Sequence, residues 1–313
     1  MNNKMAVCIL AHTDERQLSR LVHSLDSEYF DVFIHLDKKV EIERFKAVLN
    51  NTKYSKVEFI CNRFNVYWGD ISIVDATLEM MRVAQSFADE TYGSSYKRYI
   101  NISGLDYPIK SNSEIFKSLD NDTEFIMGNR LEPKEFHKLE CCYFWRCKIL
   151  NIVSMFLYKT IGYKFKKQYF VDKKGKHLDI YFAPQWHALT GKCVEYVFSF
   201  IRENPEFRTF FKHSYAPDEL LIPTIVFNSP YHVMTVKHTF PESTHYNEKT
   251  AIHYLNYEPV VEVFTEKNYD EIIGSKKLFF RKATSKESLA LVQRIEEYRK
   301  HEQERMETVN ADD

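Results

Sequence analysis

Glycine is scarce in this chain, and its scarcity argues against the common phosphate-binding loops. Only 8 of the 313 residues are glycine. No segment carries the spaced glycines of a P-loop or of a dinucleotide-binding fingerprint, both of which need glycine where the backbone approaches a phosphate. The Gly-x-Ser-x-Gly turn of a serine hydrolase is absent as well. The sequence therefore argues against P-loop nucleotidases, dehydrogenases with the usual fingerprint and serine hydrolases.

Long apolar runs and a cysteine framework are also absent. No window reaches the roughly 18 uninterrupted apolar residues of a membrane-spanning helix. The short apolar stretch at residues 5–11 has no small-residue cleavage site, so it indicates a first strand rather than a signal peptide. The six cysteines are scattered, and the closest three (Cys141, Cys142 and Cys147) lack the second ligand pair of a zinc site. We expect a cytoplasmic protein with reduced thiols.

The composition is that of a globular protein without a charge excess. Hydrophobic residues make up 44% and charged residues 28% of the chain. The formal net charge of −1 argues against nucleic acid as a partner, because domains that bind it are usually strongly basic. The chain has 20 Tyr and 24 Phe. These rings predict an aromatic-rich core, a cleft that binds sugars, or both.

Strands and helices alternate through the first part of the chain. Apolar runs predict strands at residues 5–10, 31–36, 57–61 and 98–103, and helical periodicity predicts helices at 14–26, 42–50 and 72–88. This order is typical of an α/β fold with a Rossmann-like, mainly parallel sheet. We expect this sheet to occupy one half at 1–125, continuous with a second half at 126–313. Ligands of such sheets bind at the carboxyl ends of the strands.

Residues 148–167 form an unusual segment, apolar in the middle and basic at the end. Two interpretations stay open: a packed helix with a solvated basic face, or an interfacial surface attracted to an anionic membrane. Later in the chain, residues 181–189 predict ordered structure, and 192–203, 218–227 and 286–305 predict helices.

Two acidic motifs are candidates for chemistry. Asp120 and Asp122 form an Asp-x-Asp that could hold a divalent ion, although its position after a helix is more typical of a turn. Pro217 can occupy the first turn of a helix, which would place Asp218 and Glu219 at its N-terminus. A carboxylate there is either a favourable partner of the helix dipole or a general base that deprotonates a hydroxyl.

Several segments resemble the core-2/I-branching β-1,6-N-acetylglucosaminyltransferase family, which also contains peptide O-xylosyltransferases. The matching segments occur in the family's order over nearly the whole chain: AVCILAHTDERQLSRLVHSL, VFIHLDKK, VYWGDISIVDATLEMM, YINISGLDYPIKSN, QWHALT, SYAPDELL and LFFRKATSKES. ISGLDYPIKS and FFRK are the more specific of them.

This resemblance implies a GT-A-like fold and an inverting transfer from a UDP-sugar without a metal or other cofactor. It also implies that the half at 1–125 binds the nucleotide sugar and that the half at 126–313 binds the acceptor and is catalytic. Glu219 matches the family's catalytic base, and Lys282 matches the basic residue that neutralises the leaving diphosphate, with Arg281 as a helper. The donor nucleotide is expected to contact residues after the first strands and in the neighbouring loops: Ala11, His12, Asp37, Tyr67, Trp68, Gly69, Gly104 and Asp106. Trp186 and Asp218 are candidates for acceptor binding, with a packed indole as the alternative for Trp186.

One position departs from the family pattern. A second basic residue, usually part of an Arg-Tyr pair, is replaced here by His253 before Tyr254. Either a protonated His253 lies near the diphosphate, or Arg281 supplies that charge.

Two functions remain possible on this basis. The first is a bacterial-type transferase of surface-polysaccharide assembly, with N-acetylglucosamine as the preferred sugar and an oligosaccharide or lipid-linked glycan as acceptor, at the inner face of the cell membrane. The second is a nucleotide-sugar or carbohydrate-binding protein that keeps the fold without turnover. The joint presence of Glu219 and Lys282 favours the enzyme.

Overall fold

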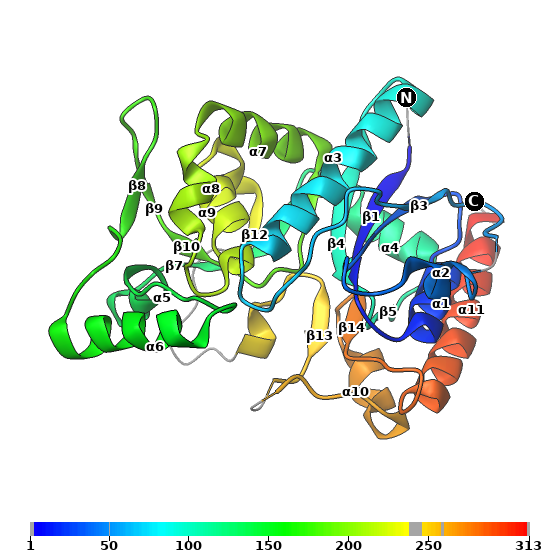
Figure 1. Cartoon of the computed structure of the whole chain (residues 1–313). Coiled ribbons are helices and arrows are strands. Elements are labelled where there is room, and N and C mark those ends of the chain that lie inside the picture. The colour runs from blue at the N-terminus through cyan, green and yellow to red at the C-terminus, as the bar shows by residue number, and fades with distance from the viewer. Residues whose placement is uncertain (1–2, 50, 238–245, 258–259, 312–313) are drawn as a thin grey trace.

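The computed structural model describes residues 3–49, 51–237, 246–257 and 260–311, and it is built around a central sheet of seven strands (Figure 1). The strand order is β12-β6-β11-β4-β1-β2-β3. Their bounds are Thr235–Lys237, Glu124–Met127, Ala188–Thr190, Arg98–Ser103, Met5–Ala11, Phe30–Leu36 and Val57–Phe59. β4, β1, β2 and β3 are parallel, and β11 is antiparallel to β4 and β6. The predicted α/β fold with a mainly parallel sheet is confirmed.

Helices cover both faces of this sheet because successive side chains of each strand point to opposite faces. Along β1, Met5, Val7 and Ile9 belong to one buried cluster, which also receives side chains from α1 (Glu15–Ser24), α4 (Asn112–Leu119) and α11 (Leu289–Ala311). Ala6 and Cys8 belong to a second cluster with α3 (Ser72–Tyr92) and α7 (Gly191–Glu203). Apolar side chains therefore surround β1 on both faces, as its continuous apolar sequence predicts.

Several predicted helices have different bounds in the structure, among them α3, which ends at Tyr92 rather than at residue 88. α2 ends at Lys46 (Ile42–Lys46) rather than at residue 50, and Phe45 is its one buried side chain. α11 begins at Leu289 rather than at residue 286, because the preceding residues form a bonded turn. In that turn the backbone N–H of Ser285 donates to Asp14 Oδ2 at 2.7 Å, and Ser288 Oγ donates to the carbonyl of Phe264 at 2.6 Å.

A second sheet, of three strands, brings together segments that are far apart in the sequence. β5 (Asp106–Pro108) pairs antiparallel with β14 (Phe279–Arg281), which pairs parallel with β13 (His253–Leu255). The register places Arg281 opposite Asp106. The central sheet likewise includes strands from both sides of residue 125, since β11 lies between β4 and β6. The division into a donor half and an acceptor half stays a prediction.

The segment predicted to be either packed or interfacial forms α6 (Lys148–Phe156), which continues into a π-helical turn at Leu157–Ile161. α6 lies apart from the central sheet, at the left of Figure 1. Its one buried side chain is Ser154, so the interpretation as a helix packed through its apolar side chains is wrong. Among the described residues, no helix combines the length and the apolar character that crossing a membrane requires.

Candidate active site

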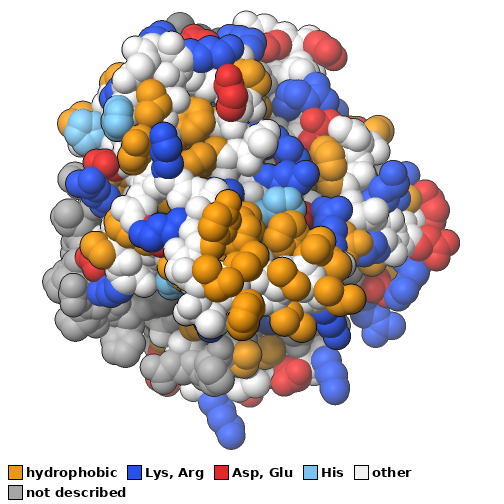
Figure 2. All heavy atoms as spheres, turned by 60° about the vertical axis from the view of Figure 1, so that its left-hand side comes forward, with side chains coloured by type: hydrophobic (Ala, Val, Ile, Leu, Met, Phe, Trp, Pro, Cys, Tyr) orange, Lys and Arg blue, Asp and Glu red, His pale blue; other side chains and the backbone are white. Residues whose placement is uncertain are grey.

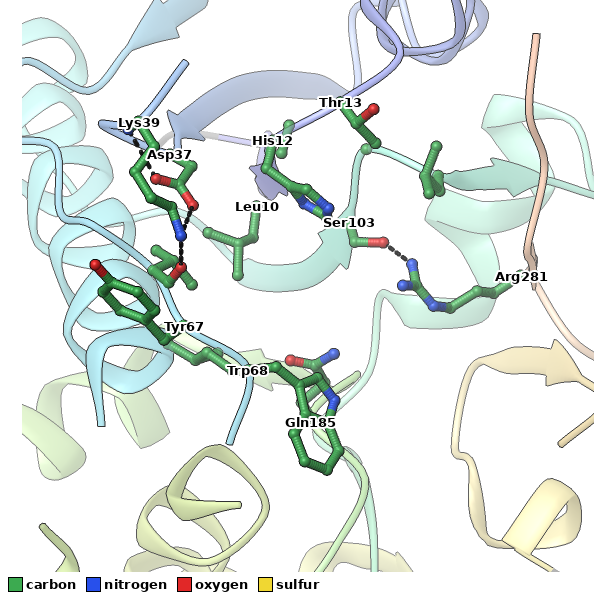
Figure 3. Close-up of a pocket in the computed structure, with 15 residues that line it drawn as sticks. Leu10, His12, Thr13, Asp37, Lys39, Tyr67, Trp68, Ser103, Gln185 and Arg281 are labelled. Carbon is green, nitrogen blue, oxygen red and sulfur yellow. Dashed lines mark hydrogen bonds and ion pairs between the residues drawn. The ribbon is translucent and has the colours of Figure 1, made fainter. Parts of the chain in front are cut away.

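A cavity of about 380 Å³ lies at the carboxyl ends of β1, β2 and β4 (Figure 3). This is the edge where α/β sheets bind their ligands. Seven of the predicted site residues line it: Ala11, His12, Asp37, Tyr67, Trp68, Gly104 and Arg281. Thr13 and Leu105, which follow the first and fourth predicted strands, line it as well. Six further lining residues were not predicted from the sequence: Leu10, Lys39, Val66, Ile73, Ser103 and Gln185.

The ends of β1 and β4 approach each other closely at Gly104. The backbone N–H of Gly104 donates to the carbonyl of Leu10 at 3.0 Å. A Cβ at this position would lie 2.9 Å from the Cβ of Ala11, closer than two such atoms normally approach. Glycine therefore allows the two strand ends to meet beneath the cavity.

One side of the cavity carries an ion pair after β2. The carboxylate of Asp37 accepts a hydrogen bond from the backbone N–H of Lys39 at 2.9 Å and pairs with Lys39 Nζ at 3.2 Å. Lys39 Nζ also lies 4.1 Å from the centre of the Tyr67 ring. Lys39 follows the predicted strand by three residues within the VFIHLDKK motif, which is the signal that could have identified it.

The opposite side carries a buried acidic centre, Asp106, which orients Arg281. Asp106 is fully buried and accepts hydrogen bonds from the Ser103 backbone N–H at 2.7 Å, from Arg281 Nη1 at 2.8 Å and from His253 Nε2 at 2.9 Å. Burial opposes its ionisation, but Arg281 and His253 outweigh burial and lower the pKa of Asp106 to about 2. Arg281 also donates to Ser103 Oγ, so its guanidinium is held at the cavity wall.

His253 and Trp186 lie behind this wall rather than on the cavity. His253 is fully buried, with Nε2 facing the Asp106 carboxylate; burial lowers its pKa, although Asp106 opposes this effect. Trp186 is 6% exposed, and its ring lies 5.2 Å from the Arg281 guanidinium. This geometry favours Arg281 over His253 as the cationic group, and the packed alternative for Trp186.

Lys282 adds a second cation next to Arg281. It is half-buried, and its pKa is lowered by burial and by the charge of Arg281. Burial lowers the pKa of His12, as do the charges of Arg281, Lys39 and Lys282, while Asp37 opposes them. Positive charge from these three side chains therefore reaches the cavity at His12, which suits an anionic ligand.

Pro217, Asp218 and Glu219 form a separate 3-10 turn, η3, rather than the first turn of one helix as predicted. Leu220, with φ −119°, interrupts the helical backbone before α9 (Leu221–Phe227). Asp218 Oδ1 is buried without a hydrogen-bond partner, and burial raises the pKa of Asp218 to about 6. Glu219 is half-buried, and neither carboxylate lines the cavity.

An aromatic cluster of Trp68, Tyr143, Trp145 and Tyr215 links this turn to the cavity. Trp68 lines the cavity, is 66% exposed, and lies 4.9 Å from Trp145 and 5.9 Å from Tyr215 between ring centres. Burial and then the charge of Glu219 raise the pKa of Tyr215, which places Glu219 near that ring. Trp68, not Trp186, therefore offers an open aromatic face beside the cavity.

The predicted turn at Asp120 and Asp122 lies away from the cavity. Asp120 follows α4 directly and pairs with Lys97 Nζ at 2.7 Å. Lys97 precedes β4, so this ion pair is at the amino-terminal edge of the sheet, opposite the ligand cavity. In the part of the chain that the structure describes, no group of three or more His, Cys, Asp or Glu side chains is placed to hold a metal ion.

Fold and cavity together define an α/β protein with a ligand site at the carboxyl edge of its sheet and with cations for an anionic ligand. A family model for the Core-2/I-Branching enzyme matches residues 5–272, and the chain belongs to this family. The family resemblance that the sequence motifs indicated is therefore confirmed, together with the GT-A-like fold that it implies.

The curated relatives are about a quarter identical to this chain over the residues that align. Rat xylosyltransferase 2 is 25% identical over 220 residues, which cover 69% of this chain and 23% of the relative. Human xylosyltransferase 1 is 24% identical over 241 residues, covering 73% and 22%. The chain therefore spans less than a quarter of their length. Among solved structures, mouse xyloside xylosyltransferase 1 in its apo form is 12% identical, with a TM-score of 0.31 and coverage of 77% of this chain and 85% of that one.

Proposed function

We propose that the protein is an inverting glycosyltransferase that moves a sugar from a UDP-sugar to a glycan hydroxyl without a metal. The observation that carries the proposal is the cavity of Figure 3, which has Asp37 and Tyr67 at one side and the Arg281 guanidinium at the other. Membership of the Core-2/I-Branching enzyme family supports it. N-acetylglucosamine is our first choice of sugar, and xylose is the second because of the relatives' names.

The donor would lie across the carboxyl ends of the strands. Uridine and ribose are assigned to the side of Asp37, Tyr67 and Trp68, where a carboxylate can accept hydrogen bonds from ribose hydroxyls and rings can contact the base. The diphosphate is assigned to Arg281 and Lys282. A guanidinium and an ammonium can stabilise the charge that develops on the departing UDP, as a divalent ion does in other enzymes.

The acceptor is assigned to the side of the aromatic cluster. Trp68 has the exposed ring that can stack on a sugar face. Glu219 is assigned as the base that removes the proton of the attacking hydroxyl, and Asp218 is the second candidate for this role. Because neither carboxylate lines the cavity, the assignment requires that the acceptor hydroxyl reach Glu219 from the side of Tyr215.

The biological role follows from the same proposal. An oligosaccharide or lipid-linked glycan of surface-polysaccharide assembly is the acceptor class that we infer, with contact to an anionic membrane. The alternative is a protein that binds nucleotide sugars without turnover. The hydrogen bond by which buried Asp106 orients Arg281 would support binding of a diphosphate equally well in such a protein.

A donor screen tests the proposal. Thermal unfolding is measured with UDP and with UDP-GlcNAc, UDP-xylose, UDP-glucose and UDP-galactose, using GDP as the control nucleotide. A ligand at about 100 times its dissociation constant stabilises the folded state by about 2.7 kcal/mol, which shifts the midpoint by several degrees. We expect UDP and one UDP-sugar to shift it, with slow release of UDP. If no uridine nucleotide shifts the unfolding midpoint, the proposal is contradicted. If a UDP-sugar binds but UDP is not released with any acceptor, the binding-protein alternative is supported.

A further inference from the structure

The helix α6 is attached to the protein through its polar side chains. Ser154 Oγ donates to the carbonyl of Cys142 at 2.6 Å, and Asn151 Oδ1 accepts from the backbone N–H of Phe144 at 3.0 Å. One turn further on, Tyr158 OH donates to Glu140 Oε2 at 3.2 Å. Positions 151, 154 and 158 share one face of a helix, so this polar face points inward.

The apolar face of α6 and of the turn after it points outward as a consequence. Ile149 is 73% exposed, Ile152 68% and Phe156 56%. Leu150, Val153, Ile161 and Tyr163 are exposed as well. We call these seven side chains the α6 patch, and Figure 2 shows a gathering of hydrophobic side chains on this side of the molecule. A surface helix of a globular protein normally has the opposite orientation, and a large exposed apolar patch marks an interaction site.

The charged side chains of the segment that carries the α6 patch have one sign. Residues 148–167 contain Lys148, Lys159, Lys164, Lys166 and Lys167 but no Asp or Glu, in a chain whose formal net charge is −1. Lys148, Lys159 and Lys167 are exposed. Lys164 pairs with Glu140 at 2.7 Å, and Lys166 donates to Ser214 Oγ at 3.1 Å, so these two are directed toward the body of the protein.

We propose that the α6 patch docks the protein on an anionic lipid surface, with the helix lying in the plane of the membrane interface. Apolar side chains on one face and flanking lysines are the combination that interfacial helices use, since the first enter the acyl boundary and the second attract anionic headgroups. At about 1.5 Å per residue, α6 and its π-helical turn extend about 21 Å, too short to span a bilayer core of about 30 Å.

The charge pattern favours a membrane over a second copy of the chain. A two-fold dimer formed through this face would place the same patch on both sides of the interface. Two lysine-rich rims without a carboxylate would then face each other and repel. Anionic headgroups supply the opposite charge along the whole rim.

The α6 patch is also connected to the proposed active site. α6 begins directly after Cys147, and the preceding Trp145 and Arg146 contact the loop that lines the cavity. A Cβ on Gly69 would meet the Trp145 indole at 2.6 Å, and Arg146 pairs with Asp70 at 2.7 Å. If the proposed transfer is correct, docking through α6 brings the acceptor side to the membrane surface, and the acceptor class is a glycan carried on a lipid.

Vesicle sedimentation of the full chain tests the docking without any nucleotide or acceptor. We expect binding to vesicles of phosphatidylcholine with 30% phosphatidylglycerol, little binding to phosphatidylcholine alone, and a decrease at high salt because screening weakens the lysine contribution. The double variant Ile152→Glu, Phe156→Glu should lose at least tenfold in partitioning. Val233→Glu is the matched control, since Val233 is 72% exposed on the distant turn η4 (Pro230–Met234).

Each substitution of Lys148, Lys159 or Lys167 by Gln should reduce binding to anionic vesicles by about fivefold. A variant that keeps the UDP-induced shift of the unfolding midpoint is folded. Loss of vesicle binding in such a variant is then a failure of docking alone, separate from any failure of the proposed transfer. Equal binding to neutral and anionic vesicles, or binding to neither, overturns the proposal. A dimer in light scattering that dissociates in the double variant overturns it as well, because the patch is then covered by a second copy.

Discussion

Two adjacent carboxylates in η3 have different surroundings. Asp218 has a buried oxygen without a partner, whereas Glu219 is half-buried near Tyr215. A base must reach the acceptor hydroxyl, and the half-buried position of Glu219 leaves part of its side chain exposed. The left-handed backbone of Ala216, with φ 46°, directly before this turn is a strained conformation of the kind found at functional sites.

Glu219→Gln should therefore keep donor affinity and lose turnover. The amide preserves the shape of the side chain but cannot accept the proton, so kcat should fall by about a hundredfold or more while the UDP dissociation constant changes little. Steady-state transfer and calorimetric UDP titration measure the two quantities. Near-normal transfer by Glu219→Gln would place the base elsewhere, with Asp218→Asn as the next variant to measure.

Lys282→Ala should behave differently, because UDP itself carries the charge that the lysine is proposed to meet. We expect the UDP dissociation constant to rise by about tenfold or more, together with a loss of kcat. Lys276→Ala is a matched control, since Lys276 is exposed six residues earlier in the chain. Unchanged UDP affinity in Lys282→Ala would remove Lys282 from the diphosphate site.

Asp218 should reduce the stability of the folded state as pH rises. Burial raises its pKa from an ordinary value of 3.8 to about 6, so between these values the folded protein retains a proton that the unfolded chain has lost. The free energy of unfolding therefore falls as pH rises through this window. Asp218→Asn should be more stable than the parent by roughly 1–3 kcal/mol at pH 7 and about equal at pH 4, as measured by urea unfolding. A variant that is less stable at pH 7 would contradict this expectation.

At the scale of elements, the loop between β3 and α3 joins the cavity to the aromatic cluster. Gly69 has φ 69°, and a Cβ there would meet the Trp145 indole at 2.6 Å. Gly93, at the C-terminal end of α3, has a similar φ of 65° but no atom within 4 Å of such a Cβ. Alanine would be strained by the left-handed backbone at both positions, but it would clash with a neighbouring side chain only at position 69. Comparing the two substitutions therefore separates backbone strain from steric contact.

Both Gly69→Ala and Gly93→Ala should lose about 1 kcal/mol of stability from the left-handed backbone. Gly69→Ala should in addition displace Trp145 and the adjoining Trp68, and so weaken donor binding by severalfold. UDP titration of the two variants measures this difference. Equal UDP affinities would show that the loop tolerates the displacement of Trp145.

At the scale of the whole molecule, the cations of the cavity come from both ends of the chain. The cations that line the cavity are Lys39, which follows β2, and Arg281, which ends β14 more than 240 residues later; Lys282 follows Arg281 directly. Because these side chains supply positive charge, transfer should proceed in EDTA at a rate close to that without it. Loss of activity in EDTA that manganese restores would contradict the proposed metal-free mechanism.

Local sequence determined the elements of this fold and many of the cavity residues. The mainly apolar runs of β1, β2 and β4 predicted the sheet, because burial on both faces favours apolar side chains at most positions. Asp37 and Gly104 could then be assigned to the site, since positions after parallel strands meet at one edge. The start of α11 differed from the prediction because Ser285 and Ser288 before it bond to residues far away in the sequence, which local periodicity does not reveal.

Tertiary structure alone decided which side of each element faces the site. Gln185 lines the cavity because the side chain of Asn101, 84 positions earlier, donates to its carbonyl. His253 is buried because β13 pairs with β14, and Trp186 is buried beneath Arg281. For α6, the periodic sequence defines a polar and an apolar face but not which of them meets the protein. Asn151 accepts a hydrogen bond from the preceding loop and Ser154 donates one to it, which turns the polar face inward, and no local pattern encodes those contacts.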